Sequence, residues 1–384
     1  MAGTDTKKTK RRRRRTRTIA VVMEFYLRAV HEGIIRYARE ASWILESGTY
    51  QLTVGRMSLA ADGILCLTVT PELRQLVDEC ALPTVTLARP VGDWPCVAMD
   101  NRAAGRMAAE HLIERGYTHL AYYQPSNYPV ADERGEGFAS VIESRGLHFH
   151  PINWEKARRR IRHGDRRRWL RDQLPKLPKP LGLFCDSDQW AVEAEVACIE
   201  ADLRVPEQVA VVGVDNDPLY VDVAPVSLTS IDNNLSLIGY EAAAMLDRIL
   251  DGHDVPTGGV VIPPKQMVMR ASTNIYAISD VVVATAVRFI RQHFREAIMV
   301  DEIAEECGIS LRLLQTKFRQ VLGRTIVQEV THIRLEHALQ MLRETTETVD
   351  SIARQCGLTS GKYLNEVMKR HIGTTPRHYR TRKG

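Results

Sequence analysis

The chain has 384 residues, of which 44% are hydrophobic and 26% charged, values that are ordinary for a globular protein. At roughly 100–200 residues per domain, this length predicts two or three domains. No apolar run approaches the about 18 residues that a membrane-spanning helix needs, so membrane insertion is not expected. No apolar signal core follows the basic N-terminus, so secretion is not expected either.

The seven cysteines are scattered singly, and no two of them have the CxxC spacing of many zinc sites. An odd number of isolated cysteines fits reduced thiols in a cytoplasm. We therefore expect a cytoplasmic, nucleoid-associated protein without a metal site, and nothing in the sequence calls for a cofactor.

The net charge of +5 is distributed unevenly along the chain. Residues 1–17 carry nine Lys or Arg and one Asp, and residues 280–384 carry 17 Lys or Arg and 12 Asp or Glu, which leaves a net charge of −8 for residues 18–279. Basic ends on an acidic body predict a polyanion as their partner. Residues 1–17 lack apolar periodicity, so we expect a disordered tail that adds nonspecific phosphate affinity. A merely solvated tail and a misplaced start codon are equal alternatives.

The middle of the chain alternates short apolar runs with amphipathic segments, as expected for strands and helices in turn. The strand candidates are Ile19–Met23, Gly63–Leu67, Thr84–Leu87, His119–Tyr123, Leu181–Cys185, Val209–Val214 and Val260–Ile262. The helix candidates are Tyr26–Arg39, Pro71–Cys80, Ala103–Arg115, Asp132–Ser144, Asp188–Ala201 and Leu235–Leu250. This alternation predicts an α/β fold with parallel sheets and helices on both faces. About 255 residues exceed one core, so we expect two lobes.

Polar residues follow several of the predicted strands. Ligands of open parallel sheets bind at the carboxyl ends of the strands, so these residues are candidates for a site. Carboxylates accept hydrogen bonds from sugar hydroxyls, a guanidinium donates a planar fork, and an aromatic ring covers the apolar face of a sugar. One such Asp alone is more often a helix N-cap, whereas several together favour a ligand cleft. The candidates are Asp100, Asn101, Arg134, Asp186, Asp188, Trp190, Asp215, Asn216 and Asp217.

Four segments of this region follow one another in an order that resembles the sugar-sensing core of the LacI-type repressors. They are 97–121 (VAMDNRAAGRMAAEHLIERGYTHLA), 131–146 (ADERGEGFASVIESRG), 182–217 (GLFCDSDQWAVEAEVACIEADLRVPEQVAVVGVDND) and 228–252 (LTSIDNNLSLIGYEAAAMLDRILDG). The resemblance covers most of residues 18–272 and implies the two-lobed fold of periplasmic sugar-binding proteins, with three crossovers. It also implies that Arg134, Asp188 and Asp215 hold the sugar. Ser187 replaces the usual Asn, and only the basic tail stands where the family has a DNA-binding headpiece.

The last hundred residues contain an internal repeat. The segment VDEIAEECGIS (300–310) recurs as VDSIARQCGLT (349–359). Each copy predicts a short helix, a turn at Gly308 or Gly357, and a second amphipathic helix. This is the helix-turn-helix pattern, whose second helix can lie in the major groove of DNA. Ile326–Leu342 has continuous helical spacing and is expected to join the two copies rigidly.

With the ending GTTPRHYR (373–380), residues 281–380 resemble the AraC-type DNA-binding domain over its full length. The resemblance places six side chains at base-facing positions: Arg312, Gln315 and Thr316 in the first reading helix, and Lys362, Tyr363 and Glu366 in the second. Arg and Lys suit guanine, Gln suits adenine, and Glu can accept from cytosine. The residues expected to contact phosphates are Arg319, Lys369, Arg377 and Arg380. The residues expected in the core are Leu314, Phe318, Leu364 and Met368.

A sugar-sensing core followed by a double helix-turn-helix domain resembles the family of bacterial xylose operon regulators, over residues 18–380. The resemblance implies D-xylose or a related pentose as effector, a homodimer on repeated DNA half-sites, and activation of catabolic genes, with RNA polymerase as a further candidate partner. It places Tyr26 and Arg28 near the ligand. Trp190 is either a stacking platform for the sugar or an aromatic of the core or of the interface between the lobes.

The expected domains are a disordered tail (1–17), a sugar-sensing domain (18–272), a linker (273–280) and a DNA-binding domain (281–384). Sugar binding is expected to close the lobes and to change how the DNA-binding domains are presented through the linker near Ala271–Ser279.

Three alternatives remain open from the sequence. One is a sugar-processing enzyme with an appended DNA-binding domain, although the chain has no GxGxxG after a strand, no Walker loop and no GxSxG elbow, and no His lies close in sequence to the Asp186/Asp188 pair. Another is a regulator that responds to a different monosaccharide, and the last is an architectural DNA-binding protein that ignores small molecules. A sugar-responsive transcription regulator that is not an enzyme is the function we expect.

Overall fold

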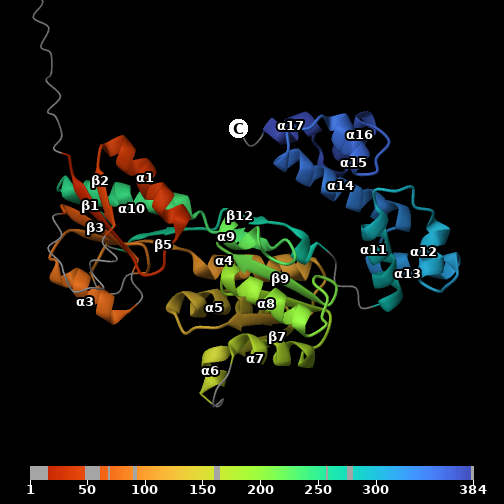
Figure 1. The fold of residues 1–384 in the computed structure, drawn as a ribbon, viewed down its shortest axis with the longest axis horizontal. Coiled ribbons are helices and arrows are strands. Elements are labelled where there is room, and N and C mark those ends of the chain that lie inside the picture. Colours follow the sequence, from red (N-terminus) through yellow and green to blue (C-terminus); the bar gives the residue numbers. More distant parts are fainter. Residues whose placement is uncertain are drawn as a thin grey trace, which may run out of the picture. The chain divides into compact units, whose positions relative to one another are not determined.

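The chain divides into two compact units, Met1–Tyr276 and Ala277–Gly384. The computed structural model describes residues 16–47, 61–67, 70–89, 93–159, 165–256, 258–274 and 280–381 of these units (Figure 1). Most of the predicted basic tail and residues 275–279 of the predicted linker lie outside the described residues. None of the described helices is long and apolar enough to cross a membrane.

The first lobe of unit one is built on a parallel sheet with the strand order β2-β1-β3-β4. A bridge between Thr86 and Cys96 joins this sheet to the parallel pair β11-β5. The strands are β1 (Thr18–Met23), β2 (Ile44–Ser47), β3 (Gly63–Leu67), β4 (Thr84–Thr86), β5 (Val97–Met99) and β11 (Val260–Ile262). The helices are α1 (Arg28–Ala41), α3 (Pro71–Glu79) and α10 (Leu235–Leu250).

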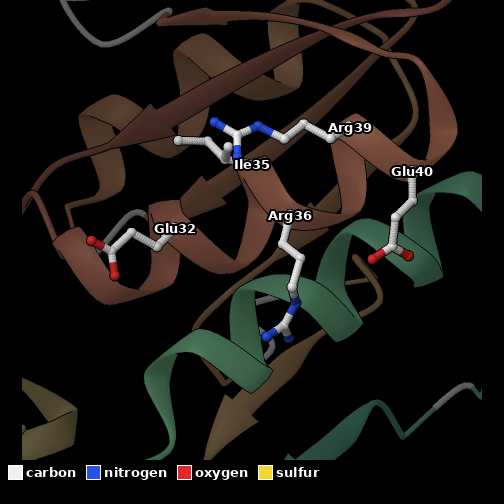
Figure 2. Close-up of a pocket in the computed structure, with 5 residues that line it drawn as sticks. All are labelled: Glu32, Ile35, Arg36, Arg39 and Glu40. Atoms are coloured by element: carbon white, nitrogen blue, oxygen red, sulfur yellow. The ribbon is translucent and has the colours of Figure 1, made fainter.

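Helix α1 packs closely against α10, from the far end of the first unit's sequence, and presents its outer face to solvent (Figure 2). A shallow hollow on this outer face is lined by Glu32, Ile35, Arg36, Arg39 and Glu40. Across the two helices, the Arg36 guanidinium lies 4.6 Å from the centre of the Tyr240 ring, and the Tyr240 hydroxyl donates to Glu40 at 2.8 Å. These contacts hold the two helices together at the surface.

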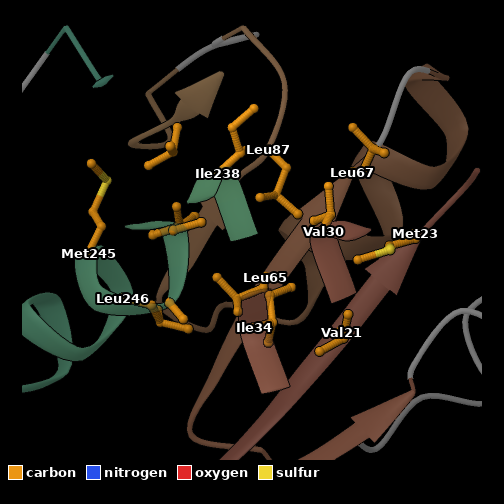
Figure 3. Packing of buried hydrophobic residues seen from close by; sticks show 14 of the residues in the cluster. Val21, Met23, Val30, Ile34, Leu65, Leu67, Leu87, Ile238, Met245 and Leu246 are labelled. Atoms are coloured by element: carbon orange, nitrogen blue, oxygen red, sulfur yellow. The ribbon is translucent and has the colours of Figure 1, made fainter. Parts of the chain in front are cut away.

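The core of the first lobe lies between its sheet and these two helices (Figure 3). Alternate residues of β1 and β3 point into it, because successive side chains of a strand face opposite sides of the sheet. The labelled members in Figure 3 are Val21, Met23, Val30, Ile34, Leu65, Leu67, Leu87, Ile238, Met245 and Leu246. The other face of the sheet is covered by α3, through Leu73 and Val77.

The second lobe contains a sheet with the strand order β12-β10-β9-β8-β6-β7, in which all neighbours are parallel except the pair β10 and β12. The strands are β6 (His119–Gln124), β7 (His148–Asn153), β8 (Leu181–Cys185), β9 (Val209–Val214), β10 (Thr229–Asp232) and β12 (Gln266–Val268). The helices are α4 (Asn101–Glu114), α5 (Pro129–Ser144), α6 (Trp154–Arg158), α7 (Arg166–Gln173), α8 (Asp188–Glu200) and α9 (Pro218–Val221), with 3-10 turns η1 (Leu174–Lys176) and η2 (Ala271–Thr273).

All seven predicted strands and six predicted helices of this region are present in the structure, within three residues at each end. The sheets are parallel as predicted, with one exception that the sequence did not reveal: β12 returns from the first lobe and pairs antiparallel with β10. The seven predicted strands do not include β2, β5, β7, β10 or β12. Strand β10 reads TSID, and its polar residues hid it, although Thr229 and Ser230 are fully buried and hydrogen-bonded.

The chain crosses between the two lobes three times, as the LacI-type resemblance implies. The crossings run from β5 to α4, from β10 to α10, and from β11 to β12. The first two pass through Asn101 and Asn233, which are both buried. Polar groups of the crossings therefore lie at the carboxyl ends of the second lobe's strands.

The second unit consists of seven helices among the described residues. They are α11 (Val281–His293), α12 (Val300–Glu306), α13 (Leu311–Leu322), α14 (Ile326–Glu344), α15 (Val349–Gln355), α16 (Gly361–Ile372) and α17 (Pro376–Thr381). Helices α12–α13 and α15–α16 form the two predicted helix-turn-helix pairs. The turns pass through Gly308 and Gly357 with φ of 65° and 71°, a conformation that glycine adopts without steric cost.

Helix α14 joins the two pairs and contributes to both of their cores. Ile326 and Ile333 pack with the first pair, and Leu335, Ala338 and Leu342 pack with the second. This confirms the prediction of one continuous connecting helix.

The glycine that begins the second reading helix has a structural reason to be there. Glycine is a poor helix former, but a Cβ at this position would lie 2.7 Å from an oxygen of Asp350. The Gly361 N–H also donates to that oxygen at 2.6 Å. Glycine therefore allows α15 to approach and cap the start of α16.

In the second lobe, α4 and α5 cross at two glycines. A Cβ on Gly105 would lie 2.1 Å from the backbone oxygen of Arg134, and a Cβ on Gly137 would lie 2.2 Å from the backbone oxygen of Arg102. The two backbones can approach this closely only where no side chain intervenes. The crossing fixes the height of Arg134 above the sheet.

We predict that Gly105→Ala lowers the free energy of unfolding of the first unit by about 1–3 kcal/mol, because the added methyl group forces the two helices apart. Gly258→Ala is the matched control, since a Cβ there would meet no atom within 4 Å. The measurement is chemical denaturation of both variants and the wild type. Equal midpoints for the two variants would contradict the close packing of α4 on α5.

Candidate functional site

Arg134 is the centre of a polar cluster at the carboxyl ends of the second lobe's strands. It belongs to α5 and is 3% exposed. Its Nε donates to the Asn101 side chain at 3.1 Å, its Nη1 donates to the backbone oxygen of Asp186, and its Nη2 donates to Asp215 Oδ1 at 3.2 Å. One guanidinium thus ties together groups that follow β5, β8 and β9.

Asp215 is held in an unusual backbone conformation immediately after β9. Its φ is 106° and that of Asn216 is 50°, values that residues other than glycine adopt rarely and at a cost of about 1–3 kcal/mol each. Asp215 Oδ1 accepts hydrogen bonds from Arg134 and, at 2.9 Å, from the Asn233 side chain. Such strain persists only where surrounding bonds enforce it, and it often marks a functional site.

Asp186 lies on the other side of the same guanidinium. Its carboxylate is 3.9 Å from Arg134 Nη1, and Ser126 donates to it at 3.5 Å. The side chains of Asp186 and Asp215 are 10% and 16% exposed, whereas that of Arg134 is 4% exposed. The two carboxylates therefore form the accessible edge of the cluster.

The structure gives Asp188 a different environment from the one that the sequence predicts. Its carboxylate is 1% exposed and accepts hydrogen bonds from the Ser230 hydroxyl at 2.5 Å and the Asp217 N–H at 2.8 Å. It also packs on Gly213, where a Cβ would lie 2.2 Å from it. Asp188 thus stabilises the loop after β9 through its bond to the Asp217 N–H. Asp186 is the carboxylate that lies beside Arg134.

Burial raises the pKa of the three carboxyl groups in and beside the cluster. Desolvation raises the pKa of Asp188 to about 8 and that of Asp186 to about 6, and it also raises the pKa of Asp215. Burial alone would lower the pKa of Arg134, but the charges of Asp215 and Asp186 outweigh it and raise that pKa. Asp186 and Asp215 face the guanidinium, whereas Asp188, which is bonded to Ser230 and Asp217, has the pKa that lies above neutrality and keeps its proton there.

The structure does not bring the other predicted ligand residues to this cluster. Tyr26 is 66% exposed and contacts His31 on α1, where its hydroxyl lies 3.2 Å from the ring nitrogen Nδ1. Arg28 pairs with Glu32 on the exposed face of the same helix. One face of the Trp190 ring is covered by the Arg166 guanidinium, 4.0 Å from the ring centre, and the ring packs on the second lobe's core. These contacts fit the core alternative for Trp190.

Two contacts join the lobes near the cluster. The rings of Phe25, after β1, and Tyr128, before α5, meet edge to face at 5.5 Å. Arg89, after β4, pairs with Glu133 at 2.7 Å, and Glu133 also accepts from Asn101 at 3.0 Å. The hollow on α1 contributes no residue to this cluster.

Two residues named as strand-end candidates prove to be helix caps. Asp100 accepts from the Ala103 N–H at the start of α4, and Asp217 accepts from the Leu219 N–H at the start of α9. Asn233 belongs to the cluster, but no argument from the sequence predicted it as a site residue. It follows the polar strand β10, and recognition of that strand would have revealed it.

On the second unit, the predicted base-facing and phosphate-facing side chains are largely on the surface. Those exposed on α13 are Arg312, Gln315, Thr316 and Arg319, and those exposed on α16 are Lys362, Tyr363, Glu366 and Lys369. On the opposite faces, Leu314, Phe318, Leu364 and Met368 are fully buried, which confirms the predicted core positions. Each reading helix therefore presents a polar face to solvent.

Arg380 differs from this set. Its Nη2 donates to the backbone oxygen of Glu347 at 2.7 Å, so it anchors α17 on the segment before α15. Arg377 is exposed. Among the described residues, no group of three or more His, Cys, Asp or Glu side chains is placed to hold a metal ion.

Known protein domains match both parts of the chain. Residues 109–273 match the periplasmic binding protein-like domain, and residues 303–382 match a helix-turn-helix domain. The chain is 29% identical to the xylose operon regulatory protein of Escherichia coli strain K12, over 92% of this chain and 94% of the relative. It is 27% identical to the protein of the same name from Haemophilus influenzae, over 92% and 95% of the two chains.

A solved structure of a xylose-binding transcription activator superposes with a TM-score of 0.71 at 25% identity, covering 96% of this chain and 98% of that one. The chain resembles the xylose operon regulators over nearly its whole length. It combines their periplasmic binding protein-like α/β domain with an AraC-type helix-turn-helix domain, as the sequence predicts. The relatives are named as transcription regulators, and this chain carries both domains through which it resembles them, one periplasmic binding protein-like and one helix-turn-helix.

The protonation of Asp188 yields a stability prediction. Since its pKa is about 8 in the folded chain and its ordinary value is 3.8, the folded state binds a proton that the unfolded state has lost between about pH 4 and 8. The free energy of unfolding therefore falls as pH rises through this window. We expect Asp188→Asn to make that fall smaller.

The measurement is the denaturant midpoint of each protein between pH 5 and pH 8. The exposed Asp172→Asn serves as control and should reproduce the pH slope of the wild type. An unchanged slope in Asp188→Asn would show that this carboxyl group does not titrate in that range.

Proposed function

We propose that the Arg134 cluster binds D-xylose or a closely related pentose between the two lobes. The observation that carries this proposal is one buried guanidinium flanked by two partly accessible carboxylates, Asp186 and Asp215, at the carboxyl ends of parallel strands. Carboxylate oxygens accept from sugar hydroxyls, and the guanidinium orients those carboxylates. The names of the full-length relatives support xylose as the first sugar to test.

Each residue of the cluster has a separate part in this proposal. Asp215 and Asp186 accept from neighbouring hydroxyls, while Asn101 and Asn233 fix the orientation of the guanidinium and of Asp215. Asp188 supports the loop from behind instead of touching the sugar. The edge-to-face pair of Phe25 and Tyr128 and the pair of Arg89 and Glu133 stabilise the closed form of the lobes.

The second unit is proposed to read DNA as one half of a homodimer. Two reading helices in each chain, linked by the shared helix α14, suit two successive contacts on one face of a duplex. Two chains joined in a dimer would occupy repeated half-sites with an affinity raised by effective concentration. The proposed base contacts are made by Arg312, Gln315, Thr316, Lys362, Tyr363 and Glu366, and the proposed phosphate contacts by Arg319, Lys369 and Arg377.

We further propose that the protein works in the cytoplasm, on the nucleoid, as an activator of pentose catabolic genes that contacts RNA polymerase. The structural relative is a xylose-binding transcription activator, which supports the sign of regulation. The proposed domain limits are those of the sequence, 18–272 and 281–384. Thr273, the next residue, is also fully buried in the first unit, which supports a boundary at this point of the chain.

Calorimetric titration with D-xylose tests the sugar site. Arg134→Lys keeps the charge but loses the planar fork, so we expect it to lose at least one hydrogen bond to a charged group, about 1.5–3 kcal/mol, and so to bind about tenfold more weakly or worse. Arg145→Lys, at the end of the same helix, is the control and should bind as the wild type does. Equal affinities for all three proteins would refute the assignment of Arg134.

The DNA contacts are tested with a duplex enriched from random DNA by the wild-type protein. Arg312→Ala should cost about 1–3 kcal/mol of affinity for this duplex and relax its preference at one base position. Arg319→Ala should instead reduce the salt dependence of log K by about one unit. Arg295→Ala, at the end of α11, is the control for removal of an exposed arginine. Loss of salt dependence without loss of base preference in Arg312→Ala would make it a phosphate contact.

A further inference from the structure

The loop that carries Asp215 is bonded to the segment at which the first unit ends. The side-chain oxygen of Asn216 accepts a hydrogen bond from Arg270 Nη2 at 2.9 Å. The same guanidinium donates through Nη1 to the backbone oxygen of Leu228 at 2.9 Å. Arg270 therefore spans from the end of β9 to the start of β10, using both branches of its fork.

The backbone at Arg270 is fixed in turn to β10. Its N–H donates to the Thr229 hydroxyl at 2.8 Å, and that hydroxyl lies 3.0 Å from the Arg270 carbonyl oxygen. Arg270 is hydrogen-bonded through its guanidinium, its backbone N–H and its backbone carbonyl oxygen. It therefore has little freedom to move independently of the Asp215–Asp217 loop. A shift of that loop is thus transmitted to the chain at residue 270.

The residues after Arg270 extend the connection as the 3-10 turn η2, in which Ser272 and Thr273 are buried. The Ser272 hydroxyl donates to the backbone oxygen of Val211 at 2.6 Å and accepts from the Thr229 N–H at 2.8 Å. The Thr273 hydroxyl lies 2.9 Å from Nε2 of His111, and Arg115 Nε donates to the Thr273 carbonyl oxygen at 2.7 Å. Ser272 and Thr273 are 0% exposed, and the second unit begins at Ala277.

We propose that Arg270 is a positioning residue that couples sugar binding at Asp215 to the segment leading into the DNA-binding unit. The inference rests on the proposed sugar site and adds the route by which its occupancy changes the exit of the chain. The sugar contacts Asp215 and shifts the loop that also carries Asn216. Because the Asn216 side chain is bonded to Arg270, Arg270 moves with the loop and displaces η2. A ligand can shift this segment only through such differential contacts between the two states.

The strained loop gives the coupling its two states. Asp215 and Asn216 both have φ in the left-handed region, and they are held there by Arg134, Asn233 and Ser230 in front and by Arg270 from the side. When a sugar competes for Asp215, the balance of these bonds changes, and the energetic cost of the left-handed backbone favours a shift of the loop. A purely structural clamp would hold η2 in place with no response to the sugar.

Hydrogen exchange of the full chain, with and without saturating D-xylose, separates the two roles. The amides to follow are Asn216, which donates to Ser230, and Ser272, which donates to the backbone oxygen of Ser227. In the wild type we expect the sugar to change exchange at both amides by about fivefold or more, the lower end of ordinary allosteric coupling. In Arg270→Gln the change at Asn216 remains and the change at Ser272 is lost.

Variants of the partner provide the reciprocal test. Asn216→Gly tolerates the left-handed backbone but removes the acceptor, so it should lose the response at Ser272 as Arg270→Gln does. Asn216→Asp keeps the acceptor and should retain the response. Arg248→Gln, which removes a guanidinium bonded to the backbone of Asp254 in the first lobe, is the matched control and should behave as the wild type.

The outcomes distinguish the two proposals. A wild-type response at Asn216 but not at Ser272, or an undiminished Ser272 response in Arg270→Gln, would overturn the coupling while leaving the sugar site intact. A lower unfolding midpoint in Arg270→Gln with the full sugar response would make Arg270 a structural clamp only. No heat of binding and no exchange response with D-xylose in the wild type would overturn the proposed sugar site, and the coupling with it.

Discussion

The hydrogen bonds of the Arg134 guanidinium hold together groups that follow three different strands. A buried arginine is stable only when all sides of its fork find acceptors, so its surroundings are strictly constrained. The glycine crossing of α4 and α5 sets its height, and Asn101 sets its rotation. Asp186 and Asp215 are then left with accessible edges, where a polyhydroxylated ligand can add the missing hydrogen bonds.

In the second unit, one helix holds two helix-turn-helix pairs together, as Arg134 holds together the ends of strands in the first unit. Helix α14 supplies apolar side chains to both helix-turn-helix pairs, so the two reading helices are positioned by one rigid element. Its polar side chains also contact the residue that ends α11: Arg334 donates to the backbone oxygen of Phe294 at 2.7 Å, and His337 stacks on the ring of Phe294. A change at the start of the unit, in α11, is therefore carried to both pairs together.

The sequence predicted the elements well because the buried strands β1, β3, β8 and β9 are continuous apolar runs and the helix-turn-helix repeat is unmistakable. It predicted Arg134 and Asp215 by resemblance and strand-end logic together. The resemblance assigned Asp188 to the sugar, whereas Asp186 is the carboxylate beside the guanidinium. Both residues follow the same strand, and only the local turn decides which of them meets Arg134. Asn233 and Arg270 escaped because they act across long sequence separations, through contacts that no local pattern records.

The most direct test of the proposed sugar site is a crystal structure of the full chain grown with D-xylose. We predict a sugar at the carboxyl ends of β8 and β9, with its hydroxyls within hydrogen-bonding distance of the Asp186 and Asp215 carboxylates and with Arg134 still bridging them. A sugar bound elsewhere, or an Arg134 cluster that keeps only its internal partners at saturating D-xylose, would contradict this assignment.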